Sequence, residues 1–342
     1  MIKIPTNVVS LGNQDTIHAH KTSKGNHTWD SESEISSSLN CSLLSLEKIK
    51  INEQKYLDRE NESLLHSYGT FLYTYSTHIE SNLPTPNFLD RHKIAPDIRT
   101  KMVNWMIEVF NAYSSEDQTF FICVQILDNY ISRCPCILTN NSIHLLGITC
   151  MFIASKFEDE YPIQMYQAQQ KIGHNKFSVY AIKEKEKQIL ECLNFDIVYS
   201  TILDFINLYF QDFISNNKAS IEYMNILTEH KGISIFLAKM LYYNECFSHL
   251  SNSIKAVSCV TFGLELVKIK VGNKLSGEND RDKSYEKEVE MQFTMLEEWV
   301  KFLKENMRER RGILELTINK LKEFYQLSYE NGFSNVQNLL SH

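Results

Sequence analysis

Residues 143–157 read IHLLGITCMFIASKF, and this stretch decides the fold of the chain. From Leu145 to Ala154 nearly every side chain is apolar, so a helix here would have no polar face for water to cover. Such a helix belongs inside a bundle or in a membrane. A membrane span needs roughly 20 apolar residues, whereas this run ends at Lys156 and the acidic residues 158–160. We therefore expect a central core helix that other helices surround.

The composition favours an all-α protein large enough for about two domains. The chain has 342 residues, 43% of them hydrophobic, with only 11 glycines and 6 prolines. Long stretches also follow the helical period of apolar residues. The net charge of −7 offers no basic face for nucleic acid, and the N-terminus lacks the apolar core of a signal peptide. We expect neither nucleic acid nor a membrane as a partner.

The cysteines are expected to be reduced thiols of an intracellular protein, because most fall on apolar helix faces. They lie at positions 41, 123, 134, 136, 150, 192, 246 and 259. Cys134 and Cys136 are the only close pair, and no second pair stands at zinc-ribbon spacing. The sequence thus predicts no metal site and no cofactor.

The helical pattern divides the chain into four parts. Residues 1–42 are polar and predict a flexible tail, and residues 43–95 predict an N-terminal helical segment that is firm from Leu64 to His78. A first bundle is expected over 96–199 and a second over 200–342. In the first bundle we expect five helices, over 96–113, 115–133, 139–157, 161–172 and 178–193. A capping box at Ser115 would begin the second of them.

The second bundle is expected to repeat this order of helices with little residue-level similarity. Its helix over 253–269 is apolar around most of its girth, like residues 143–157. The pattern predicts a polar loop over 270–284. The remaining helices are expected over 200–213, 221–229, 233–243, 285–308 and 312–326.

Four segments of the first bundle carry a family resemblance. Residues 98–109 read IRTKMVNWMIEV, 127–132 LDNYIS, 154–162 ASKFEDEYP and 189–197 ILECLNFDI. In this order and spacing they resemble MRAILVDWLVEV, LDRFLS, ASKFEEIYP and ILxxLxFDL of the cyclin box of A- and B-type mitotic cyclins. The resemblance implies two tandem five-helix cyclin-fold bundles, preceded by an N-terminal helix and the tail.

The resemblance implies a regulatory subunit that binds and activates a cyclin-dependent protein kinase in cell-cycle control and performs no chemistry itself. The matching kinase-binding residues are Lys156, Glu186, Phe157, Ile153 and Phe195. Physical chemistry supports the first two of these residues. Lys156 suits the C-terminal end of a helix and can donate to carbonyl oxygens of a partner. Glu186 can accept N–H groups of the partner while it pairs with Lys156. The alternative is an ion pair within the bundle beside a solvated acidic run.

A second implied site is a shallow patch that binds Arg-x-Leu motifs of substrates or inhibitors. Its matching residues are Ile98, Lys101, Met102, Trp105, Glu108, Ile143 and His144. Trp105 would cover a leucine and Glu108 would pair with an arginine. Lys101 replaces an apolar family residue, and Asn104 and His144 replace an aspartate and a glutamine, so we expect weakened or redirected docking. The alternative is that this face is ordinary packing surface.

Two other classes of function compare differently with the sequence. The alternative function is that of a cyclin-fold scaffold or a transcription-related cyclin without a mitotic role. An enzyme does not fit, because the sequence has no glycine-rich phosphate loop, His-Glu-x-x-His pair or Gly-x-Ser-x-Gly elbow. We therefore expect no catalytic residues. We expect the protein in the nucleus and cytoplasm.

Overall fold

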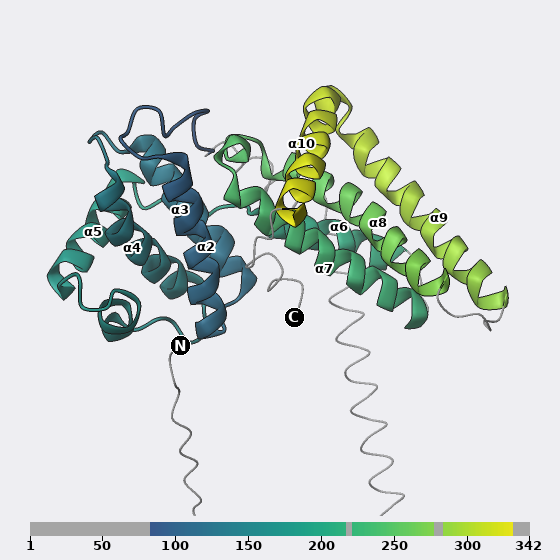
Figure 1. Cartoon of the computed structure of the whole chain (residues 1–342), viewed down its shortest axis with the longest axis horizontal. Helices are drawn as coiled ribbons and strands as arrows, with labels where there is room; N and C mark the ends of the chain where they lie inside the picture. Colours follow the sequence, from purple (N-terminus) through teal and green to yellow (C-terminus); the bar gives the residue numbers. More distant parts are fainter. Residues whose placement is uncertain (1–82, 217–220, 277–282, 331–342) are drawn as a thin grey trace, which may run out of the picture. The chain divides into compact units, whose positions relative to one another are not determined.

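A computed structural model describes residues 83–216, 221–276 and 283–330 of the chain. The expected tail over 1–42 and the helix from Leu64 to His78 lie outside these residues. The described part is built from helices (Figure 1), and its single isolated β-bridge joins Lys93 to Thr139. The expected all-α class is therefore confirmed.

The first bundle surrounds its central helix, as the sequence predicts. Its helices are α2 (Pro96–Tyr113), α3 (Asp117–Arg133), α4 (Asn140–Glu158), the short π-helical turn η1 (Gln167–Ile172) and α5 (Val179–Cys192). Helix α4 contacts α2, α3, α5 and η1 (Figure 1). Every residue from Leu146 to Ser155 is buried, so α4 is the core helix that its sequence requires.

The starts of these helices agree with the sequence predictions at one cap and differ from them at two positions. Ser178 caps α5 as expected, its hydroxyl accepting a hydrogen bond from the backbone of Ala181. Ser115 does not cap α3, since Glu116 holds the cap position without a side-chain bond and Ser115 donates instead to Asp159. The helix expected over 161–172 is shorter, because residues 161–164 are not helical.

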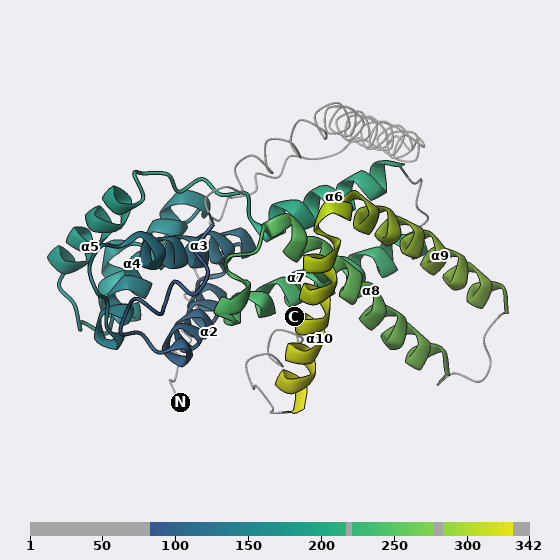
Figure 2. The same ribbon diagram turned by 90° about the horizontal axis from the view of Figure 1, so that it is seen from above.

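The second bundle is arranged around α8, the counterpart of α4. Its helices are α6 (Ile202–Asn216), α7 (Ile221–Tyr243), η2 (Glu245–Phe247), α8 (Asn252–Ser276), α9 (Lys283–Asn306), η3 (Arg308–Arg310) and α10 (Arg311–Glu330). Helix α8 contacts α6, α7, α9 and α10, and α10 also contacts α7 (Figure 2).

Two sequence predictions for the second bundle were wrong. The two helices expected over 221–229 and 233–243 form one helix, α7, which runs through Gly232. A side chain at Gly232 would meet nothing within 4 Å, so this glycine marks an exposed helix position and not a break. The loop expected over 270–284 is also shorter, because α8 continues to Ser276 and α9 begins at Lys283.

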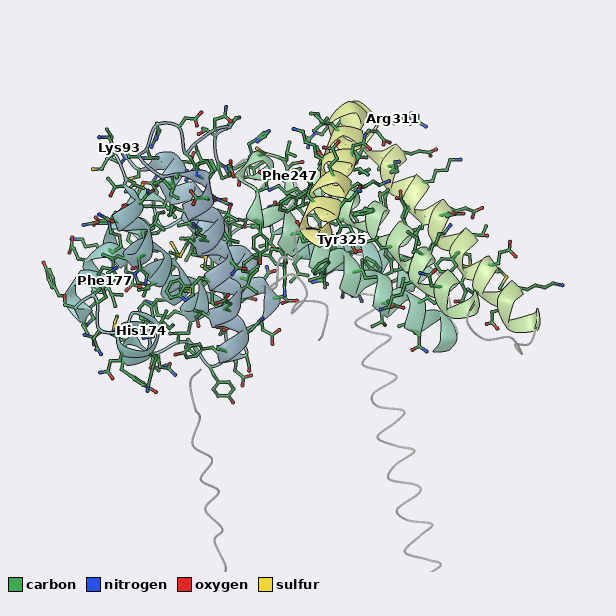
Figure 3. The ribbon with its side chains drawn as sticks, viewed as in Figure 1. Lys93, His174, Phe177, Phe247, Arg311 and Tyr325 are labelled. Atoms are coloured by element: carbon green, nitrogen blue, oxygen red, sulfur yellow. The ribbon has the colours of Figure 1, made fainter. Side chains whose placement is uncertain are left out.

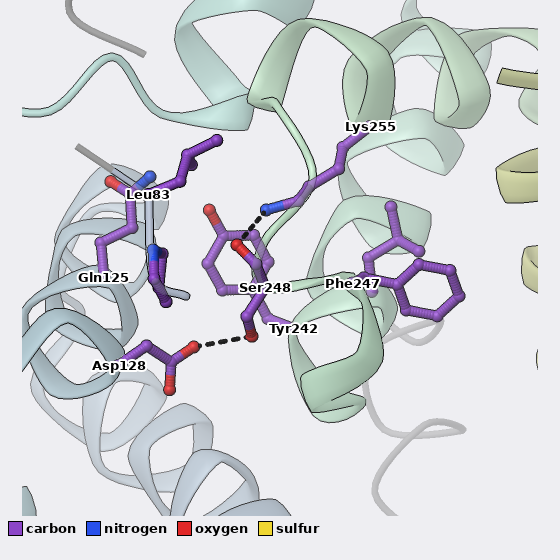
Figure 4. Close-up of a pocket in the computed structure, with 9 residues that line it drawn as sticks. Leu83, Gln125, Asp128, Tyr242, Phe247, Ser248 and Lys255 are labelled. Carbon is purple, nitrogen blue, oxygen red and sulfur yellow. Dashed lines mark hydrogen bonds between the residues drawn. The ribbon is translucent and has the colours of Figure 1, made fainter. Parts of the chain in front are cut away.

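A buried charge pair joins the two bundles. Arg99 on α2 is fully buried, and its guanidinium donates to both carboxylate oxygens of Asp128 on α3, at 2.8 and 2.6 Å. The same guanidinium donates to the backbone carbonyl of Tyr242 at 2.9 Å. Carbonyls in the last turn of a helix have no partner inside that helix, so Arg99 caps the end of α7. Ser248 adds a hydroxyl bond to Asp128 at 2.9 Å beside a small cavity (Figure 4).

The core of the second bundle contains a titratable group. His230 on α7 is fully buried against the rings of Phe210 and Trp299, and its Nε2 lies 2.8 Å from the carbonyl oxygen of Val260. Burial lowers the pKa of His230 to about 4, since a charged imidazole would lose its hydration there.

His230 should make the protein sensitive to acid. The folded pKa of about 4 lies below the unfolded value of 6.5, so the unfolded chain binds the extra proton between these limits. The stabilisation from neutral His230 is complete above pH 6.5 and is lost as the pH falls toward 4. Denaturant unfolding should show a loss of about 3 kcal/mol over this range that His230→Leu lacks. Equal pH slopes for the two proteins would contradict the assignment.

Candidate protein-binding site

An ion pair between α4 and α5 stands at the surface of the first bundle. Lys156 lies in the last turn of α4, where a cation is favoured by the helix dipole. Its ammonium pairs with the carboxylate of Glu186 on α5, and it also lies 4.3 Å from the centre of the Phe152 ring. The side chains keep 41% and 17% of their surface exposed, so both can still meet a partner.

Two of the predicted apolar site residues are exposed and one is not. Phe157 follows Lys156 directly and is 46% exposed, while Phe195 is 67% exposed. Asn194 and Phe195 both have positive φ, at 53° and 58°, so the chain turns sharply after α5. Ile153 is buried, so it supports α4 from inside and offers no surface.

Asp159 fixes the end of α4, a role that the sequence analysis missed. Its carboxylate accepts hydrogen bonds from the hydroxyls of Ser155, Ser115 and Thr119, the first two at 2.6 and 2.9 Å. These bonds connect the last turn of α4 with the start of α3, one turn from Lys156. The sequence feature that could have indicated this role is the i, i+4 spacing of Ser155 and Asp159. It is hard to recognise because Asp159 lies within a run of three acidic residues.

The predicted docking patch contains a stack of rings. The His144 ring lies between Trp105 and Phe177, with ring centres 5.2 and 5.4 Å apart and edge-to-face geometry on both sides. Phe177, which the sequence analysis did not foresee, lies with His174 at one end of the bundle (Figure 3). Burial and then the nearby charge of Lys176 lower the pKa of His144, so the ring is neutral near pH 7.

The other patch residues differ in exposure. Met102 and Ile143 are buried, whereas Ile98 is partly buried at the edge of the core. Lys101 is exposed, and its ammonium pairs with Asp97 at 2.9 Å. Since Asp97 lies one turn toward the start of α2 and Trp105 one turn toward its end, the ammonium is held away from Trp105. Glu108 accepts a hydrogen bond from Asn104 at 3.0 Å.

Neither a metal centre nor a membrane segment emerges from the described residues. No group of three or more His, Cys, Asp or Glu side chains within them could hold a metal ion. In the same ranges, no helix is both long and apolar enough to cross a membrane. The seven cysteines within the described ranges are all free thiols, four of them buried.

Comparison with known proteins identifies the first bundle. The sequence model of the cyclin N-terminal domain matches residues 71–198, which include α2, α3, α4 and α5. This part of the chain belongs to the cyclin family. Its cyclin box therefore contains both the Lys156–Glu186 pair and the Trp105 patch.

The relatives that the chain matches include mitotic cyclins. It is 28% identical over 165 residues to the G2/mitotic-specific cyclin-B of Spisula solidissima, covering 48% of this chain and 37% of the relative. It is 33% identical over 137 residues to the G2/mitotic-specific cyclin-1 of Saccharomyces cerevisiae, covering 40% and 28%. With cyclin-A2 of Xenopus laevis it shares 27% over 161 residues, covering 46% and 37%. The matches thus span less than half of each relative.

A solved structure extends the likeness to the second bundle. The X-ray structure of a viral cyclin from herpesvirus saimiri superposes with a TM-score of 0.52 at 17% identity, covering 73% of this chain and 95% of the viral one. This coverage exceeds the span of the N-terminal domain model, so it reaches into the second bundle. At this identity the likeness shows the fold alone, which is the expected tandem cyclin fold.

Proposed function

We propose that this cyclin is a regulatory subunit that binds and activates a cyclin-dependent serine/threonine protein kinase. The observation that carries the proposal is the surface pair of Lys156 and Glu186 beside the exposed ring of Phe157. Exposed aromatic side chains next to a charged pair suit a protein interface. The similarity to mitotic cyclins points the same way.

The pair can recognise the backbone of a partner loop. The ammonium of Lys156 has three donors and uses one on Glu186, so it can donate to carbonyl oxygens of the kinase. The carboxylate of Glu186 can accept N–H groups from the same loop. Docking there would place the C-helix of the kinase so that its glutamate pairs with the lysine of the ATP site, which kinase activity requires. The cyclin contributes no reacting group.

The direct test uses the whole chain and purified kinases. The protein is mixed with inactive cyclin-dependent kinases, and both binding and histone phosphorylation are measured. Capture from cell extract followed by mass spectrometry identifies the partner. We expect one kinase to bind and gain activity. If no cyclin-dependent kinase binds, the alternative of a cyclin-fold scaffold or transcription-related cyclin without a mitotic role takes its place.

We further propose that the Trp105 patch docks substrates or inhibitors with Arg-x-Leu motifs. The partly exposed Ile98 and Trp105 offer apolar area for the leucine, and Glu108 offers a carboxylate for the arginine. Such docking, in the nucleus and cytoplasm, would select substrates for the bound kinase.

Lys101→Ile should strengthen Arg-x-Leu binding by about 1 kcal/mol. The reason is the added apolar area next to Ile98 and Trp105. Charge relief contributes little, because Asp97 already pairs with the ammonium of Lys101 at the surface. Fluorescence polarisation of a labelled Arg-x-Leu peptide measures the change, and Trp105→Ala should abolish it. A variant that binds no better than wild type would make this face ordinary packing surface.

A further inference from the structure

A groove of about 610 Å³ opens on the second bundle between α8, α9 and the start of α10. Leu264 and Val300, both buried, form its apolar base, and charged side chains form its rim. Its volume lies in the usual range for ligand sites of about 300–1,000 Å³. The groove includes no residue of the first bundle, so it is separate from the kinase site and the Trp105 patch.

The rim carries an excess of positive charge in a chain whose net charge is −7. Lys268 and Lys304 are already paired, with Glu297 and Glu315 respectively. Three further basic side chains on the rim form no ion pair with any described side chain. These are Lys301, Arg308 and Arg311.

The acidic side chains of the rim do not cancel this excess. Glu297 is committed to Lys268, and Glu265 pairs with Lys322. Within the described ranges, Glu305 is the one carboxylate of the rim without such a pair. Among the rim residues without an ion-pair partner, three basic side chains therefore stand against one carboxylate.

A buried hydroxyl at the groove lacks a partner. Thr261 on α8 is 8% exposed, lines the groove, and its hydroxyl makes no hydrogen bond to any described residue. Leaving a buried hydroxyl unpaired costs about 1–3 kcal/mol. Other helical hydroxyls of the same bundle, such as that of Ser258, donate to a backbone carbonyl four residues earlier. A ligand oxygen in the groove would supply the bond that Thr261 lacks.

The start of α10 brings further positive charge to the same place. Arg311 is its first residue and lies at the turn from α9 into α10 (Figure 3). The N–H of Arg311 already donates to the carbonyl of Arg308 in the preceding 3-10 turn η3 (Arg308–Arg310), so this end contributes its helix dipole, which favours anions. The 20-residue helix thus points its positive end at the side of the groove that holds the uncommitted arginines.

We propose that this groove binds a partner peptide through a phosphoserine or phosphothreonine. One carboxylate would satisfy one cation, whereas a phosphate carries about −1.5 to −2 charges and three acceptor oxygens. That matches several cations without an ion-pair partner, a hydroxyl donor and the positive end of a helix dipole. The open, apolar base accommodates the neighbouring peptide side chains. An anionic membrane fits less well, because a flat surface would also meet the carboxylates of the rim.

The test measures direct binding to the whole chain without any kinase, so its outcome does not depend on the proposed kinase function. The probe is a fluorescein-labelled peptide, Gly-Ala-Asp-Leu-pSer-Leu-Asp-Ala-Gly, and its controls carry serine or glutamate in place of phosphoserine. We expect the phosphopeptide to bind at least about 10-fold more tightly than either control. The affinity should fall steeply with salt.

Matched variants locate the site. Arg308→Ala combined with Arg311→Ala should weaken phosphopeptide binding by about 10-fold or more. Lys320→Ala, which removes an exposed cation of α10 outside the groove, should change nothing. Thr261→Val should weaken binding and also raise thermal stability, since it removes an unpaired hydroxyl.

Three results would overturn the proposal. The first is equal affinity of the phosphoserine and serine peptides. The second is phosphopeptide affinity that neither the double arginine variant nor Thr261→Val changes. The third is sedimentation with phosphoinositide vesicles that the arginine variant abolishes, without phosphopeptide binding. That result would make the groove a membrane contact. Unchanged circular dichroism of the exposed variants controls for folding.

Discussion

Arg99→Ala is expected to lower the free energy of unfolding by about 3–5 kcal/mol, the range for breaking a buried ion pair from one side. Arg99 is fully buried, and its guanidinium satisfies the carboxylate of Asp128 and the carbonyl of Tyr242. Its removal leaves a carboxylate in the interior without its cation. It also leaves the end of α7 without its cap.

Denaturant titration measures this change, with Lys101→Ala as the matched control two positions along the same helix. Lys101 is exposed and pairs at the surface, so its loss should change stability by less than about 1 kcal/mol. Arg99→Met combined with Asp128→Leu should recover part of the loss, because no isolated charge then remains buried. A loss below about 1 kcal/mol for Arg99→Ala would show that the pair contributes little.

Lys156→Ala and Glu186→Ala are each expected to weaken binding of the cognate kinase by about 2–5 kcal/mol, or roughly 30-fold or more. Each variant removes one member of a pair that the interface would desolvate. Their own folding should change little, because Lys156 is 41% exposed in the free protein. Calorimetry against the kinase and thermal unfolding of the free variants separate the two effects.

A matched control and a charge swap make this result decisive. Lys187 on α5 is 64% exposed and pairs with Glu191 one turn away, so Lys187→Ala removes a similar pair outside the proposed contact. The swap Lys156→Glu with Glu186→Lys keeps an ion pair within the bundle but reverses both charges toward the kinase. If the charge-swapped variant and both alanine variants bind the kinase as tightly as wild type, the Lys156–Glu186 pair only stabilises the bundle and does not contact the kinase.

The core of the first bundle could be predicted because its signal is local. A segment without a polar face has to be buried, and Leu146 to Ser155 are all buried as a result. The ends of the helices were harder to predict from the sequence. Ser115 has the sequence of a cap, yet its hydroxyl donates to Asp159, which lies 44 positions away. A residue of this kind competes between local and distant partners, and its sequence does not decide between them.

The junction and the site geometry depended on contacts that no local pattern encodes. Arg99 was visible in the sequence, but its bond to the carbonyl of Tyr242 joins positions 143 apart. Phe177 completes the ring stack of the docking patch only because α5 folds back beside α4. The sequence predicts two helices over 221–229 and 233–243, and Gly232 lies between them. Packing of α7 against α8 outweighs the low helix preference of glycine, so the two form one helix.

The cap that Arg99 places on α7 makes the two cyclin folds thermodynamically interdependent. Neither bundle can separate from the other without stranding a guanidinium, a carboxylate and a helix terminus at once. A substitution that destabilises α7 or α8 would therefore also affect α2 and α3, which pack against α4, the helix with Lys156 in its last turn. Substitutions far from any partner surface would in this way weaken the proposed kinase-binding site.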